Sequence, residues 1–291
     1  MKIIDGKKVS NEVLDEIKLA VQNRKKLNLK IPHLAAVLVG DDGPSQTYVN
    51  SKIRACERVG FESSLFQFDK SITENELISE IEKINFNDDI DGFIVQLPLP
   101  KGINQENILN KVLPKKDVDG FNPINYGKMA LGIETFLPAT PAGIIELIKR
   151  YSIDLKGKKC LVIGRSQIVG RPISILLSQN KIFGNATVTV AHSRSNNLKE
   201  ICLDSDIIIS AIGIPEFIKE DMIKTGSIII DVGICRVEDD NSLKGYRIVG
   251  DVDFDSVYDK VSLITPVPGG VGPMTISMLL KNTLRASSLN D

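Results

Sequence analysis

A phenol and an amine stand four residues apart in the segment YVNSK, residues 48–52. On a helix this spacing places Tyr48 and Lys52 on the same face. A lysine that is buried or crowded loses proton affinity and can exchange protons near neutral pH. The alternative is a solvated lysine beside a half-buried tyrosine, and the spacing alone favours that alternative.

Gln96 and a pair of carboxylates are also placed where ligands bind. Gln96 lies near the end of residues 91–97, a predicted buried strand, and open α/β sheets bind ligands at the carboxyl ends of their strands. Asp117 and Asp119 stand in a glycine-containing loop and could bind a cation or, through paired hydrogen bonds, an amidine-like heterocycle. A metal is less favoured because other hard oxygen ligands are not evident nearby. The simpler alternatives are a glutamine that satisfies loop backbone groups and a solvated turn.

A glycine turn at residues 164–170 indicates a nucleotide. It follows the apolar run 160–163 and precedes the amphipathic stretch 172–179, which predicts a strand, a turn and the start of a helix. Backbone N–H groups and the helix N-terminus in such a turn bind phosphate. The turn departs from the G-x-G-x-x-G pattern because Ser166 replaces the second glycine, so the motif alone is weak.

The end of the next predicted strand indicates which nucleotide binds. An NAD-binding domain usually has Asp or Glu there, for the ribose hydroxyls, whereas this chain has Ser193 and Arg194. A hydroxyl and a guanidinium suit a 2′-phosphate, and Arg165 in the glycine turn adds a second cation. The pattern therefore favours NADP over NAD, the alternative being that both arginines are ordinary surface residues.

Residues 265–275 have the most unusual composition in the chain, with three glycines and three prolines before the last predicted helix. Such a loop has a defined shape and exposes backbone groups, and it is seldom only a spacer.

Helix and strand patterns alternate along the chain and must position these groups. This alternation predicts an α/β protein with parallel sheets and helices on both faces. Predicted helices cover residues 10–27, 45–59, 105–112, 141–151, 172–179 and 273–286, with a further helix opened by a Thr73–Glu76 capping box. Predicted strands cover residues 33–39, 64–68, 91–97, 160–163, 186–191, 206–211, 227–232 and 263–267. We expect an α/β domain over residues 1–140, a Rossmann-like domain over 141–270, and a last helix in 271–291 that packs back on the first domain.

Composition narrows the class of protein. A net charge of −1 over 291 residues favours neither nucleic acid nor an anionic membrane surface. No apolar run approaches the ~20 residues of a membrane span, and the N-terminus does not resemble a signal peptide. Four widely spaced cysteines indicate reduced thiols and a cytoplasmic location. Only two histidines are present, which disfavours a histidine-rich metal site and leaves few candidates for a histidine triad.

Together these motifs resemble the bifunctional methylenetetrahydrofolate dehydrogenase/cyclohydrolase family, known as FolD. The matching segments occur in the family's order: YVNSK (48–52), VQLPLP (95–100), KDVDGF (116–121), GRSQIVGRP (164–172), GDVDF (250–254) and PGGVGPMT (268–275). One departure concerns Ala139 and Ala142, where the family commonly has a cysteine and a basic residue. We expect local repacking there, with a basic contact put in doubt.

The resemblance implies two reactions of one-carbon folate metabolism, which supplies purine biosynthesis. NADP-dependent oxidation converts 5,10-methylenetetrahydrofolate to the methenyl form, and hydrolysis then yields 10-formyltetrahydrofolate. The resemblance implies catalytic roles for Lys52, Tyr48, Gln96 and Asp119. It implies further folate contacts at Leu97, Pro268, Gly269 and Gly270. Cofactor contacts are expected at Gly164, Arg165, Ser166, Ser193, Arg194 and Ile234, with no metal and with a homodimer formed through the Rossmann-like domain.

Three alternatives remain from the sequence. A dehydrogenase of the same family without cyclohydrolase activity is one. A shikimate-dehydrogenase-like NADP enzyme is another, although the loop at residues 268–275 disfavours it. The third, a non-catalytic nucleotide-binding regulator, is disfavoured because Tyr48, Lys52, Gln96 and Asp119 are all present.

Overall fold

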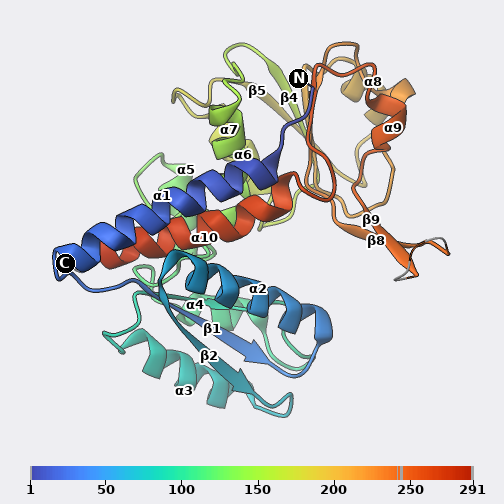
Figure 1. Cartoon of the computed structure of the whole chain (residues 1–291). Coiled ribbons are helices and arrows are strands. Elements are labelled where there is room, and N and C mark those ends of the chain that lie inside the picture. The colour runs from blue at the N-terminus through green and yellow to red at the C-terminus, as the bar shows by residue number, and fades with distance from the viewer. Residues whose placement is uncertain (1, 241, 243–244, 290–291) are drawn as a thin grey trace. The chain divides into compact units, whose positions relative to one another are not determined.

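A computed structural model describes residues 2–240, 242 and 245–289 of the chain (Figure 1). The chain forms two compact units, one from the residues up to Ser10 together with Thr140–Thr275, the other from Asn11–Ala139 together with the residues from Ile276 onward. The first residues join the second half because Ile4 N donates to Ile264 O at 2.8 Å. The domain ranges and their functional assignments from the sequence remain predictions, and residues 290–291 of the last range lie outside the described residues.

The unit that contains Asn11–Ala139 is built on a parallel sheet in the order β2-β1-β3, as expected. Its strands are β1 His33–Val39, β2 Glu62–Phe68 and β3 Gly92–Val95. Its helices are α2 Gly43–Val59, α3 Glu74–Asn85, α4 Gln105–Lys111 and α5 Pro123–Ala130. Because the strands are parallel, their carboxyl ends share one edge of the sheet, where Gln96 directly follows β3.

Local signals explain most helix ends in this unit. Thr73 accepts a hydrogen bond from Glu76 N and Glu76 bonds back to Thr73 N, so the predicted capping box is confirmed. The predicted cap of α2 at Ser45 is wrong. Asp42 caps the helix by accepting from Ser45 N at 2.9 Å, because Gly43 and Pro44 are accommodated in the first turn.

One helix and one hairpin have no counterpart among the predictions. The helix α5 follows an Asn122 cap and Pro123, but eight residues with an internal glycine make a weak periodic pattern. The strands β8 Cys235–Glu238 and β9 Tyr246–Val249 form an antiparallel hairpin, so not every sheet in the chain is parallel. The predicted strand 91–97 is also shorter: Val95 is the last residue of β3 paired with β1, although Gln96 N still donates to Val37 O at 2.9 Å.

The other unit contains a parallel sheet in the order β10-β7-β6-β4-β5. Its strands are β4 Lys159–Ile163, β5 Thr187–Ala191, β6 Ile207–Ser210, β7 Ile228–Asp231 and β10 Leu263–Ile264. Its helices are α6 Ala139–Arg150, α7 Gly170–Ser178, α8 Leu198–Leu203 and α9 Phe254–Val257, with a 3₁₀ turn at Glu220–Met222. The first strand, β4, has the second on one side and the third on the other, so the direction of strand addition reverses between β4 and β6.

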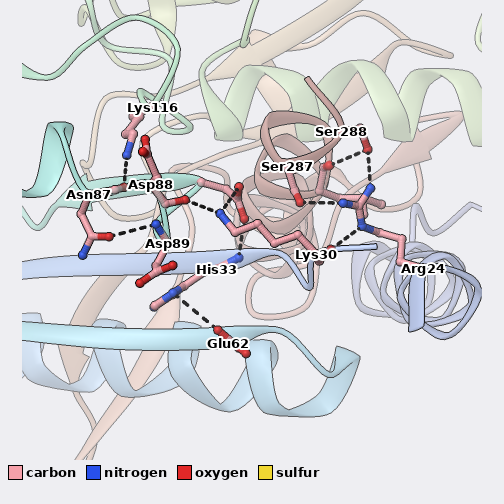
Figure 2. Close-up of polar contacts among 12 residues, drawn as sticks. Arg24, Lys30, His33, Glu62, Asn87, Asp88, Asp89, Lys116, Ser287 and Ser288 are labelled. Atoms are coloured by element: carbon pink, nitrogen blue, oxygen red, sulfur yellow. Dashed lines mark hydrogen bonds and ion pairs between the residues drawn. The ribbon is translucent and has the colours of Figure 1, made fainter. Parts of the chain in front are cut away.

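The long helices α1 Gly6–Lys26 and α10 Val271–Ser288 run beside each other in Figure 1. Near their C-terminal ends, Arg24 donates to Ser287 Oγ at 3.0 Å and to Ser288 Oγ at 3.2 Å (Figure 2). Asn282 Nδ2 donates to Val118 O at 2.8 Å and to Leu137 O at 3.0 Å. The last helix therefore packs on the first half of the chain, as expected.

A polar network connects the segments that precede β1 and β3, at the amino ends of these two strands. Lys30 Nζ donates to Asp91 Oδ1 at 2.9 Å, and Asp91 Oδ2 accepts from His33 N at 2.9 Å. Figure 2 shows Lys116 reaching the same region to bond Asn87. Lys116 is the first residue of the acidic loop, residues 116–121, so the network helps to position that loop.

Among the described residues, no helix is both long enough and apolar enough to cross a bilayer.

Candidate active site and cofactor site

Lys52 and Gln96 meet at the carboxyl edge of the β2-β1-β3 sheet. Lys52 comes from the middle of α2, and its Nζ donates to Gln96 Oε1 at 3.1 Å. Gln96 Nε2 in turn donates to Leu97 O at 2.8 Å, which fixes the amide so that its oxygen faces the lysine. The sequence predicted both residues for the site, and the structure brings them into contact.

Burial changes the proton affinity of Lys52. Desolvation lowers the pKa of Lys52 below its ordinary value, while the nearby Asp119 carboxylate partly opposes this shift. The neutral amine is thus more accessible near physiological pH than it is in an exposed lysine. Such a group can accept a proton from a reacting molecule.

Asp119 is held beside Lys52 by the acidic loop. The loop runs along β3, since Phe93 N donates to Lys116 O at 3.0 Å and Asp117 forms a parallel bridge with Phe93. Gly92 permits this approach, because a Cβ at that position would overlap Val118. Burial raises the pKa of Asp119 to about 6, and the Lys52 charge acts in the opposite direction.

Asp117, the other carboxylate of the predicted pair, is buried and accepts hydrogen bonds from nearby residues of the chain. Asp117 Oδ2 accepts from Asn122 N and from Asn125 Nδ2, both at 2.8 Å, and Oδ1 accepts from Phe121 N at 3.1 Å. A carboxylate with these bonds shapes the loop and leaves Asp119 as the group of the pair that can pair with a ligand. Sequence reasoning missed the supporting Asn282, which lies 164 residues from Val118.

Tyr48 lies one helical turn before Lys52 on α2, and half of its surface is exposed. Tyr48 is not part of the hydrophobic core, so its ring is accessible to a ligand. Leu97, the other expected folate contact in this unit, is half-buried directly after Gln96.

The glycine turn after β4 is closely packed against its neighbours. Gly164 has a φ of +115°, and a Cβ on it would overlap Ala211 O. A Cβ on Gly170 would overlap Gly164 O, so α7 starts against the turn. Ser166 Oγ accepts from Val169 N at 3.2 Å and from Gly170 N at 3.3 Å. The turn is therefore a closely packed backbone cradle that only glycines allow, which fits a dinucleotide phosphate.

The predicted 2′-phosphate contacts lie at neighbouring strand ends. Arg165 follows β4, Ser193 and Arg194 follow β5, and these two strands are paired in the sheet. All three side chains are exposed, and Arg194 N donates to His192 Nδ1 at 3.1 Å within the second turn. The apolar Ile234, after β7, is 52% exposed. Two cations and a hydroxyl without a carboxylate fit NADP.

The loop with Pro268, Gly269 and Gly270 packs on the start of α1. Lys7 N donates to Gly269 O at 2.8 Å, and a Cβ at Gly6 would overlap Gly270 O. Gly6, the first residue of α1, was the available sequence signal for this contact. The loop belongs to the unit of Thr140–Thr275, whereas Tyr48, Lys52, Gln96 and Asp119 belong to the other unit.

The fold is that of a two-unit α/β protein of the dehydrogenase class, with a partly buried lysine at the strand ends of one sheet and a glycine turn after the first strand of the other. Two family models match the chain, the tetrahydrofolate dehydrogenase/cyclohydrolase catalytic domain over residues 4–119 and the NAD(P)-binding domain of the same family over residues 138–291. The chain therefore belongs to the tetrahydrofolate dehydrogenase/cyclohydrolase family.

Individual relatives agree with this family. The bifunctional protein FolD of Christiangramia forsetii is 60% identical over 286 residues, covering 98% of this chain and 96% of the relative. The solved structure of the bifunctional FolD enzyme from Campylobacter jejuni is 45% identical, with a TM-score of 0.92 and 99% of each chain covered. The FolD enzyme of Trypanosoma brucei, solved with NADP and an inhibitor, is 36% identical, with a TM-score of 0.92 and coverage of 99% and 97%.

The family expected from the six motifs is thus confirmed, and with it a bifunctional folate dehydrogenase and cyclohydrolase that uses NADP. The shikimate-dehydrogenase-like alternative and the non-catalytic regulator are wrong.

Proposed function

We propose that Lys52, Gln96 and Asp119 form the centre at which this chain converts 5,10-methylenetetrahydrofolate to 10-formyltetrahydrofolate. The observation that carries this proposal is the half-buried Lys52 amine, hydrogen-bonded to Gln96 at 3.1 Å and with its pKa lowered beside Asp119. A general base with reduced proton affinity is what the hydrolytic step requires.

In hydrolysis, water adds to the cationic methenyl carbon and must lose a proton. The neutral Nζ of Lys52 takes that proton, directly or through a second water. The bond between this carbon and N5 of the folate then breaks, the added hydroxyl gives up its proton as it becomes the carbonyl, and N5 takes up a proton, leaving the formyl group on N10. Gln96 accepts a hydrogen bond from Nζ throughout and so keeps the amine aimed at the reacting carbon.

The oxidation uses the other unit. When bound, NADP⁺ supplies the two-electron acceptor for the methylene carbon. Gly164 and Ser166 would receive its phosphates, Arg165, Ser193 and Arg194 its 2′-phosphate, and Ile234 an apolar face.

Folate recognition is assigned to both units. Asp119 pairs with ring N–H groups of the pterin, and Tyr48 stacks on or hydrogen-bonds the substrate. Leu97 and the segment Pro268–Gly270 are the further folate contacts that the family resemblance implies. These assignments rest on the exposed Tyr48 ring, on the position of Asp119 beside Lys52, and on the motif match.

One assay tests the two activities. The protein is incubated with 5,10-methylenetetrahydrofolate and NADP⁺, while reduced cofactor and methenyl absorbance are followed separately. We expect reduced cofactor to accumulate while the methenyl signal stays transient. A persistent methenyl signal would show a monofunctional dehydrogenase, and absence of cofactor reduction would refute the dehydrogenase assignment.

Removing the two cations should abolish cofactor preference. In the double variant Arg165→Ala/Arg194→Ala, we expect the KM for NADP⁺ to rise at least about tenfold, because charge-assisted hydrogen bonds contribute about 1.5–3 kcal/mol. The KM for NAD⁺, which lacks the 2′-phosphate, should change little. Arg58→Ala is a matched control, since Arg58 pairs on the surface with Asp15. Equal kcat/KM for NAD⁺ and NADP⁺ in the unmodified protein would contradict the assignment.

We also infer a cytoplasmic homodimer. The four cysteines are buried free thiols, as suits a reducing compartment, and the dimer follows from the family resemblance. Sedimentation equilibrium should give twice the chain mass of 32.0 kDa, and a monomer at micromolar concentration would refute the dimer.

A further inference from the structure

The GDVDF motif, residues 250–254, has no role in the function proposed above. Its second residue, Asp251, is fully buried. Asp251 Oδ2 accepts from Ser210 Oγ at 3.0 Å and from Ile212 N at 2.8 Å, and Oδ1 accepts from Ile214 N at 3.0 Å. A single carboxylate therefore holds both ends of the turn that follows β6.

A second buried carboxylate, Asp231 at the end of β7, fastens the motif itself. Asp231 Oδ1 accepts from Asp251 N at 3.0 Å and from Gly233 N at 2.9 Å, and Oδ2 accepts from Val252 N at 2.9 Å. A Cβ at Gly250 would overlap Asp231, and a Cβ at Gly233 would overlap Asp251. The two glycines thus admit the two carboxylates into the backbone.

Burying this pair opposes folding. Desolvation raises the pKa of Asp231 to about 7, against the hydrogen bonds from the Asp251 and Val252 backbone. Well-packed apolar side chains are often as stabilising as buried charges. The presence of carboxylates here is therefore better explained by the loops that they hold in place.

Those loops lie at the switch point of the sheet, between β4 and β6, where open α/β sheets bind their ligands. Gly164 follows β4. Because it has no side chain, the carbonyl oxygen of Ala211, in the loop after β6, can pack against it. Ile212 directly follows Ala211, and its backbone N–H donates to Asp251 Oδ2. The carboxylate thereby sets the backbone wall beside the glycine turn.

We propose that Asp251, supported by Asp231, is a positioning residue for NADP, which holds the loops after β6 and β7 in their receptive shape before the cofactor binds. The bond from Gly233 N extends this support to the adjacent Ile234. Preorganised loops bind more tightly because their ordering does not oppose association. The proposal rests on the placement of the cofactor at the Gly164 turn.

Asp251→Asn tests the proposal. An asparagine keeps the size but has one acceptor oxygen in place of two, so one of the N–H groups of Ile212 and Ile214 loses its partner. We expect the Kd of the apoprotein for NADP⁺, measured by calorimetry, to rise at least about tenfold, which corresponds to the ~1–3 kcal/mol of an unsatisfied buried donor. Affinity for tetrahydrofolate should stay within about twofold. Amide hydrogen exchange at Ile212 and Ile214 should accelerate.

Asp253→Asn is the matched control within the same motif. Asp253 caps α9 by accepting from Ser256 N at 3.3 Å, and asparagine caps a helix equally well. NADP⁺ affinity should therefore be unchanged in this variant. Ser210→Ala removes one bond to Asp251 and leaves both backbone bonds, so it should weaken NADP⁺ binding mildly even if Asp251→Asn does not fold.

Two results would overturn the proposal: wild-type NADP⁺ affinity in the folded Asp251→Asn variant, or a parallel loss of NADP⁺ and tetrahydrofolate affinity, which marks a general structural role. If Asp251→Asn does not fold, unchanged affinity in Ser210→Ala would overturn it. Failure of the unmodified protein to bind NADP⁺ would instead refute the cofactor site on which the proposal rests.

Discussion

Lys52→Met is expected to reduce cyclohydrolase turnover by about 10²–10⁴-fold, the usual contribution of a positioned general base. Methionine has nearly the same length and removes the amine that Gln96 holds at 3.1 Å. The decay of methenyl absorbance, with 5,10-methenyltetrahydrofolate added as the substrate, measures this step without the cofactor.

The pH profile provides a second readout. In the unmodified protein the hydrolysis rate should fall as pH decreases through the lowered pKa of Lys52, because protonated Nζ cannot accept a proton. This acid limb should be absent from the residual rate of Lys52→Met. The variant should also unfold at the same temperature or higher, since it no longer buries a charged group.

Lys18→Met is the control, because Lys18 is an exposed lysine on α1. It should retain wild-type turnover. Unimpaired hydrolysis in folded Lys52→Met would disprove proton transfer by this residue.

Asp119→Asn is expected to weaken folate binding by at least about tenfold, since an amide cannot accept hydrogen bonds at both positions as a carboxylate does. Both turnover reactions should decline, because both use the same bound folate. Direct titration with tetrahydrofolate separates the loss of affinity from the loss of rate.

The same variant should change stability in a pH-dependent direction. The pKa of Asp119 rises from 3.8 to about 6 on folding, so the native state favours the protonated carboxyl. The protonated Asp119 carboxyl therefore stabilises the folded state fully at pH values below the unfolded pKa. This contribution to the free energy of unfolding, at most about 3 kcal/mol, is lost as pH rises through about 6. Asparagine does not ionise, so the stability of Asp119→Asn relative to the unmodified protein should increase between about pH 4 and about pH 7.

Thermal unfolding of the apoprotein at these two pH values measures this difference. Asp15→Asn, which changes an exposed carboxylate, should show no such trend. If Asp119→Asn leaves folate affinity and both turnover rates unchanged, the pterin anchor is assigned to the wrong residue.

A link between the two residues can be checked with the same proteins. The Asp119 charge raises the pKa of Lys52, so its removal should move the acid limb of hydrolysis to lower pH. A purely structural effect of Asp119→Asn would lower the rate without moving that limb.

The local features of this protein were determined by its sequence. The capping box at Thr73 and Glu76, the pairing of Tyr48 with Lys52 on one helix face, and β1 at residues 33–39 each depend on neighbours within a few positions. Such contacts follow from fixed helix and strand periods. The motif order additionally indicated the family and its cofactor.

Only the tertiary structure decided which of these residues act together. Lys52 and Gln96 are 44 residues apart, and Asp251 lies 37–41 residues from the groups that it binds. Asp117 and Asp119 looked equivalent in one loop, but folding directs the first into backbone hydrogen bonds and places the second beside Lys52. Proton affinities likewise depend on burial and on charges that the fold brings close. Periodicity carries no information about such distant partners, so the chemistry of this site follows from the parallel sheet and the loops that its strand ends bring together.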